Sequence, residues 1–91
     1  MVKIYDGKDV PPDALLYFTT PTCKPCKSMA PILESLENVT FLKVDCEQNA
    51  VLASAYTIYT VPALVRLRGG RPVESMFGGK TREQIVAWLE E

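Results

Sequence analysis

The sequence predicts an α/β fold in which a mixed central sheet has helices on both faces. Residues 14–46 have the order strand, helix, strand, and such a unit forms a parallel pair joined by a right-handed crossover. A Gly-Gly pair at 69–70 separates two strand-like segments, which is typical of an antiparallel hairpin. The 91 residues are 47% apolar and 23% charged, an ordinary globular composition. We therefore expect one domain over residues 1–91.

The first 19 residues predict two strands and no helix. Residues 2–5 alternate apolar and polar side chains, which indicates a short strand. Residues 6–13 contain a glycine and a Pro-Pro pair, so they predict a loop. Residues 14–19 (ALLYFT) form a nearly continuous apolar run, as expected of a central strand buried on both faces.

The next segment changes to a helical pattern. Over residues 23–37, Met29, Leu33 and Leu36 recur at steps of four and three and form one apolar stripe. Pro31 lies inside this helix, where it removes a backbone hydrogen bond and predicts a kink.

The second half predicts a strand, a short helix, a hairpin and a last helix. In the hairpin, Arg66 and Arg68 alternate with apolar residues, so we expect them, with Arg71, on a solvated edge that discourages further strand pairing. Thr81 and Gln84 have capping-box spacing at the start of the last helix, in which Trp88 is expected to pack. The predicted ranges are strand 39–46, helix 48–56, strand 63–68, strand 73–77 and a helix from 81 onward.

Charge and composition exclude several classes of function. Ten Lys and Arg against eleven Asp and Glu give a net charge of -1, so nothing in the charge favours a nucleic-acid or membrane partner. The absence of histidine removes imidazole bases and histidine metal sites. No apolar run approaches the ~20 residues of a membrane span, and no signal-peptide pattern begins the chain, so we expect a cytoplasmic protein.

The spacing of Cys23 and Cys26 is the main chemical signal. Cys23 begins a helix shortly after a buried strand, where free backbone N–H groups and the helix dipole favour a thiolate. Lys24 and Lys27 add positive charge, and Pro25 stiffens the turn. A fall of the thiol pKa from about 8.5 to roughly 7 is typical of such sites.

The two cysteines are expected to divide the chemistry between them. Cys23 would attack a substrate disulfide, and the more buried Cys26 would resolve the mixed disulfide. The alternative is half of a zinc site, which needs about four ligands, and only Cys46 remains to serve. We therefore predict no metal, and we expect Cys46 to be a small buried apolar side chain.

These residues together resemble the thioredoxin superfamily over residues 14–91, and within it a small thioredoxin-like protein. The likeness rests on CKPC, on Pro31 five residues after Cys26, on a Val-Pro pair before a strand and on a glycine after the hairpin. The resemblance implies a thioredoxin-like fold that lacks the first helix, and a monomeric protein-disulfide reductase. It also implies a redox-active disulfide without a bound cofactor, disulfide-containing protein substrates, and electrons from NADPH through a thioredoxin reductase-like donor.

The resemblance also assigns a substrate-binding surface. Pro62 matches a cis-proline that faces the cysteines, Val61 offers its backbone to a bound peptide, and Gly78 lets the substrate backbone approach. The expected set is Thr22, Lys24, Pro25, Val61, Pro62 and Gly78.

Three positions depart from the family pattern. Thr22 replaces the usual tryptophan, Tyr17 replaces a buried aspartate that helps to move the proton of the second cysteine, and Phe41 replaces the lysine that partners this aspartate. Both members of a charged pair are therefore absent together, which leaves no buried charge unpaired. Proton transfer through water is the expected substitute, since a phenol is a poor base at neutral pH.

Two alternatives remain open. The lead-in TTPTC, the TVP segment and the Gly78-Gly79 pair before a capped helix resemble glutaredoxins, which use glutathione. Against this, the motif has no tyrosine, and its third position is proline as in thioredoxins. The other alternative is a non-catalytic thioredoxin-fold subunit that serves in a larger assembly.

Overall fold

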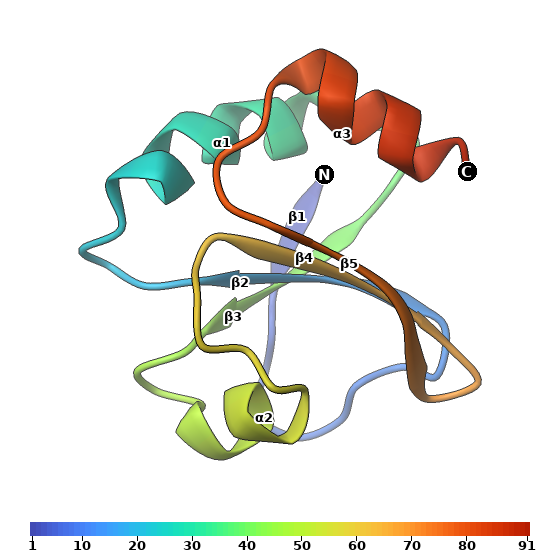
Figure 1. The fold of residues 1–91 in the computed structure, drawn as a ribbon. Coiled ribbons are helices and arrows are strands. Elements are labelled where there is room, and N and C mark those ends of the chain that lie inside the picture. The colour runs from blue at the N-terminus through green and yellow to red at the C-terminus, as the bar shows by residue number, and fades with distance from the viewer.

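The computed structural model describes all residues from 1 to 91 and contains one five-stranded sheet and three helices (Figure 1). The strand order across the sheet is β1-β3-β2-β4-β5. In chain order the elements are β1 (Val2–Ile4), β2 (Ala14–Thr19), α1 (Lys24–Ser35), β3 (Phe41–Asp45), α2 (Ala50–Ala55), β4 (Ala63–Arg68), β5 (Arg71–Phe77) and α3 (Arg82–Leu89).

The sheet is mixed, as the sequence predicts. β3 pairs in parallel with both β1 and β2, so the β2–α1–β3 unit is the expected parallel crossover. β4 pairs antiparallel with β2 and with β5, and the β4–β5 pair is the predicted hairpin. β2 lies at the centre of the sheet, and its last four residues are buried. This burial explains its continuous apolar sequence.

Helices cover both faces of the sheet. α1 and α3 lie over one face, and α2 lies over the other (Figure 1). Because successive side chains of a strand point to opposite faces, Tyr17 and Phe41 join the first core while Phe18 and Val44 join the second. The first core contains Met29 and Leu33 of α1 with Ile85 and Trp88 of α3. The second contains Ala53 of α2 and Ile58 of the following turn.

Most predicted elements are confirmed, with small shifts at their ends. α1 begins at Lys24 because Cys23 is its N-cap residue, and Pro31 lies inside the helix. The bend at Pro31 stays a prediction. The chain between β1 and β2 forms no helix. The Thr81–Gln84 capping box is present at the start of α3.

The expectation of a solvated Arg66 is wrong. Its side chain is buried, with only 7% of the residue exposed. The guanidinium donates to the Glu74 carboxylate of β5 at 2.7 Å and to the Trp88 carbonyl of α3 at 2.7 Å. Its central carbon also lies 4.6 Å from the centre of the Trp88 ring. A neighbouring strand and the last helix cover this arginine, whereas Arg68 and Arg71 are exposed as predicted.

None of the three helices has both the length and the apolar character that crossing a bilayer requires.

Candidate active site

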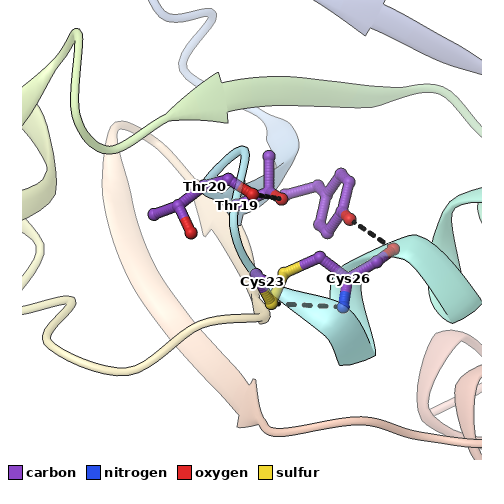
Figure 2. The surroundings of a disulfide bond; sticks show 5 residues. Thr19, Thr20, Cys23 and Cys26 are labelled. Carbon is purple, nitrogen blue, oxygen red and sulfur yellow. Dashed lines mark hydrogen bonds between the residues drawn. A yellow bond between two sulfur atoms is a disulfide. The ribbon is translucent and has the colours of Figure 1, made fainter.

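Cys23 and Cys26 form a disulfide at the start of α1, with their Cα atoms 5.3 Å apart (Figure 2). Cys23 is the N-cap residue, and its Sγ accepts a hydrogen bond from the amide of Cys26 at 3.2 Å. Pro25 lies in the first turn, where its missing N–H costs nothing. Cys23 is 9% exposed and Cys26 only 3%, so the second cysteine is the deeper one, as predicted.

The surroundings of this helix end favour negative charge on sulfur. The first turn of α1 contains no acidic residue, and the exposed Lys24 and Lys27 flank the motif. The partial positive charge of the helix N-terminus adds to theirs. A thiolate formed at Cys23 therefore meets free amide groups and cationic neighbours. The low pKa of the Cys23 thiol in the reduced protein stays a prediction.

The expected cis-proline is present, because the Val61–Pro62 peptide bond is cis. The amide of Gly78 donates to the carbonyl of Pro62 at 2.8 Å, so the end of β5 is fastened to this turn. Gly78 has a φ of +86°, in the left-handed region that favours glycine. Val61 packs against the core cluster that contains both motif cysteines.

Gly79 brings the same loop against the cysteine motif, which sequence reasoning did not assign. A Cβ built on Gly79 would lie 3.3 Å from the Cβ of Pro25, closer than most real contacts. Only a residue without a side chain leaves this approach unstrained. The Gly78-Gly79 pair in the sequence is the feature that could have indicated this close approach. Gly78, Gly79 and Pro62 are thus tied into one surface beside Pro25, while Thr22 is exposed next to Cys23.

Tyr17 and Phe41 fill the place where the resemblance would have put a charged pair. Both are buried in the first core, and the Tyr17 hydroxyl donates to the carbonyl oxygen of Cys26 at 3.1 Å (Figure 2 shows this bond). Burial raises the pKa of the Tyr17 phenol from 10.0, although a hydrogen bond with Thr19 lowers it in part. Tyr17 is therefore protonated at neutral pH and acts as a donor to the active-site helix, not as a base.

We predict that Tyr17→Asp changes the pH dependence of disulfide reduction. A carboxyl group buried here is desolvated, which raises its pKa. The Lys43 ammonium opposite it in the sheet register acts in the other direction, but Lys43 is exposed, so solvent screens its charge and burial is the larger effect. The carboxyl group can then accept the Cys26 proton near neutral pH. With a folded-state pKa above the unfolded value of about 4, the variant loses stability as the pH rises. The measurements are a pH–rate profile and urea unfolding at several pH values.

Tyr17→Phe is the control for this prediction, because it removes the hydroxyl without adding a charge. Its pH–rate profile should match the parent. Identical profiles for Tyr17→Asp and the parent would remove this position from the proton-transfer step.

Cys46 is separate from the disulfide. It follows β3, is half-buried against the second core, and its amide donates to the Thr19 carbonyl at 2.9 Å. Burial raises the pKa of the Cys46 thiol, and the neighbouring Asp45 carboxylate raises it further. The thiol is therefore protonated at neutral pH, consistent with a packing role.

Comparison with known proteins agrees with this geometry. The family model named Thioredoxin matches residues 8–91. The chain is 34% identical over 82 residues to a thioredoxin of Alicyclobacillus acidocaldarius, an alignment that covers 85% of this chain and 78% of the relative. It is 29% identical over 92 residues to a thioredoxin of Staphylococcus aureus, covering 96% and 88%.

Among solved structures, a mutant thioredoxin from Halobacterium salinarum superposes with a TM-score of 0.79 at 30% identity, covering 87% of this chain and 73% of that one. In this chain the fold places the Cys23–Cys26 disulfide at the N-terminus of α1. The chain therefore belongs to the thioredoxin family and is a thiol-disulfide oxidoreductase of the thioredoxin type, with a redox-active disulfide.

Proposed function

We propose that this protein reduces disulfides in other proteins by cycling Cys23 and Cys26 between the dithiol and the disulfide. The observation that carries the proposal is the position of the two sulfurs. Cys23 lies at the N-cap of α1, and Cys26 lies one turn inside the helix and donates its amide to the Cys23 sulfur at 3.2 Å. The outer sulfur is thus the one that helix dipole and lysines favour as a thiolate.

In this proposal Cys23 attacks the substrate disulfide and releases one substrate thiolate. Cys26 then loses its proton and attacks the Cys23 sulfur, so the second substrate thiolate leaves and the intramolecular disulfide closes. Two electrons pass from the dithiol to the substrate, and no bound cofactor takes part. The electrons return from NADPH through a thioredoxin reductase-like donor.

A peptide substrate is proposed to lie along the surface formed by Thr22, Lys24, Pro25, Val61, Pro62 and Gly78. The turn before β4 and the end of β5 are tied together by the Gly78–Pro62 hydrogen bond, and Gly79 lies against Pro25. The backbone of Val61 can then pair with an extended substrate segment in strand-like fashion.

The deciding experiment sets two substrates side by side. Insulin reduction with NADPH and a thioredoxin reductase tests the proposed route, and reduction of a glutathione mixed disulfide with NADPH, glutathione and glutathione reductase tests the glutaredoxin alternative. We expect turnover in the first assay and little in the second. Turnover in the glutathione assay alone would show that glutathione, and not a thioredoxin reductase, supplies the electrons. Failure in both assays, with biological activity unaffected by Cys23→Ser, would favour a non-catalytic subunit.

A further inference from the structure

A hollow of about 200 Å³ opens beside the deeper cysteine. Its lining includes six residues with polar or sulfur atoms: Tyr17, Thr19, Thr20, Cys26, Lys27 and Lys43. Figure 2 shows Thr19 and Thr20 next to the disulfide. A second hollow of about 180 Å³ shares Thr19, Thr20 and Lys43 and reaches Asp45. We call the first space the Cys26 hollow. It is large enough for several water molecules and has the polar partners that they need.

Lys43 projects into this space from the sheet. It lies directly opposite Tyr17 in the register of β2 and β3, so both side chains point towards the face that α1 covers. The single salt bridge in the structure joins Arg66 and Glu74, so no carboxylate neutralises Lys43 or Lys27 at ion-pair distance. Lys27 and Lys43, both exposed and without an ion-pair partner, therefore line the same hollow as Cys26.

The other side chains around the Cys26 hollow do not cancel the positive charge of the two lysines. β1 places the apolar Ile4 beside Lys43, and Tyr17 on β2 is a neutral phenol. Asp45 lies two residues further along β3. One oxygen of its carboxylate accepts hydrogen bonds from the backbone amides of Glu47 and Gln48, at 2.8 and 3.4 Å.

The remaining elements on this side add no charge to the hollow. β4 and α3 contribute apolar side chains to the first core: Leu64, Ile85 and Trp88. On α1 the titratable groups near Cys26 are Cys23, Lys24 and Lys27. No carboxylate lines the Cys26 hollow itself, and Asp45 lines the adjoining space.

We propose that Lys43 is a positioning residue that favours the Cys26 thiolate when the mixed disulfide is resolved, and that water in the Cys26 hollow takes the proton. The inference rests on the proposed dithiol cycle and goes beyond it by naming the group that activates the second cysteine. Cys26 gives its Sγ proton to water, and its thiolate attacks the Cys23 sulfur. The bond between Cys23 and the substrate sulfur breaks, and its electron pair leaves with the substrate thiolate, which takes a proton from solvent.

The physical need for such a group follows from burial. Cys26 is 3% exposed within an apolar core, and desolvation disfavours a charged sulfur. The Tyr17 phenol cannot take the proton at neutral pH, because burial raises its pKa. A positive charge in a partly solvated space offsets part of the cost of forming the thiolate.

The experiment follows the two cysteines separately in one reaction. In a Cys46→Ala background, the reduced protein is mixed with dithiobis-nitrobenzoate, which releases one coloured thiolate when Cys23 attacks and a second when Cys26 resolves the mixed disulfide. The second step is unimolecular, so it does not depend on the encounter with this anionic reagent. We expect Lys43→Gln to slow the second release roughly three- to tenfold at neutral pH and to move its pH midpoint upward.

Two variants separate charge from structure. Lys43→Arg keeps the positive charge and should retain the rate of the second step. Lys3→Gln makes the same charge change on the neighbouring strand β1, at an exposed position in register with Leu42 and therefore on the opposite face. It should leave the second step unchanged. Urea unfolding of each variant checks that the fold is intact.

The outcomes distinguish this inference from the function on which it rests. An unchanged rate and pH midpoint in Lys43→Gln would overturn the role of Lys43 while leaving the dithiol cycle standing. Absence of any second release in the parent protein would overturn the cycle itself. A second measurement follows the pKa of the Cys26 thiol by carbon-13 titration at low and high salt. Because salt screens the Lys43 charge, added salt should raise this pKa more in the parent protein than in Lys43→Gln. Equal salt effects would also count against the proposal.

Discussion

Replacing Cys23 by serine is expected to lower disulfide reduction roughly a thousandfold or more, because a serine hydroxyl does not ionise near neutral pH and its oxygen cannot enter a disulfide exchange. Cys26→Ser should instead leave the first attack intact and accumulate a mixed disulfide through Cys23, since the resolving sulfur is absent. Insulin reduction measures the first effect, and non-reducing gels with mass spectrometry detect the trapped species.

Cys46→Ser is the matched control for both variants. It makes the same chemical change at the remaining cysteine, which lies outside the disulfide and packs against the second core. Its reduction rate should be close to that of the parent protein. Substantial activity in Cys23→Ser, or a mixed disulfide that forms through Cys46, would show that the reactive sulfur has been assigned to the wrong residue.

The largest expected effect on stability is that of Arg66→Met, which should lower the free energy of unfolding by about 1–3 kcal/mol. The substitution removes the hydrogen bonds from the guanidinium to Glu74 and to the Trp88 carbonyl, and the contact with the Trp88 ring. Glu74 remains 37% exposed and can turn to water, which keeps the loss below that of a fully buried pair. Urea unfolding followed by Trp88 fluorescence and circular dichroism measures it.

Arg68→Met provides the comparison. Arg68 ends the same strand but is exposed, so the same substitution should change the unfolding free energy by about 0.5 kcal/mol or less. Equal losses in the two variants would mean that the connections of Arg66 to β5 and α3 contribute nothing to stability.

Elements could be predicted from the sequence where neighbouring residues alone, or a match to the family pattern, indicate one structure. The apolar run of residues 14–19 predicted a central strand, which β2 confirms, and the cis bond at Pro62, which the resemblance to the family implied, is present. Arg66 shows the opposite case. Its alternation with Val65 and Leu67 fits a solvated face as well as a buried one, and the outcome depends on Glu74 and α3, which are distant in sequence.

In the active site too, features set by neighbouring residues could be predicted, and features set by packing between distant segments could not. The Cys23–Cys26 pair and the N-cap position of Cys23 follow from neighbouring residues. The Tyr17 bond to the Cys26 carbonyl depends on how α1 packs against the sheet. The place of Lys43 in the Cys26 hollow needs the register between β2 and β3, which no local pattern specifies.

The two faces of the sheet are covered by helices of unequal length, and this difference affects where the protein opens transiently. α1 and α3, of twelve and eight residues, protect the side that contains the disulfide, whereas α2 has only six residues on the other side. Transient local opening should therefore begin at α2, where amide hydrogens will exchange with deuterated solvent soonest. The half of the domain that holds the cysteines can then keep its shape while the opposite half fluctuates.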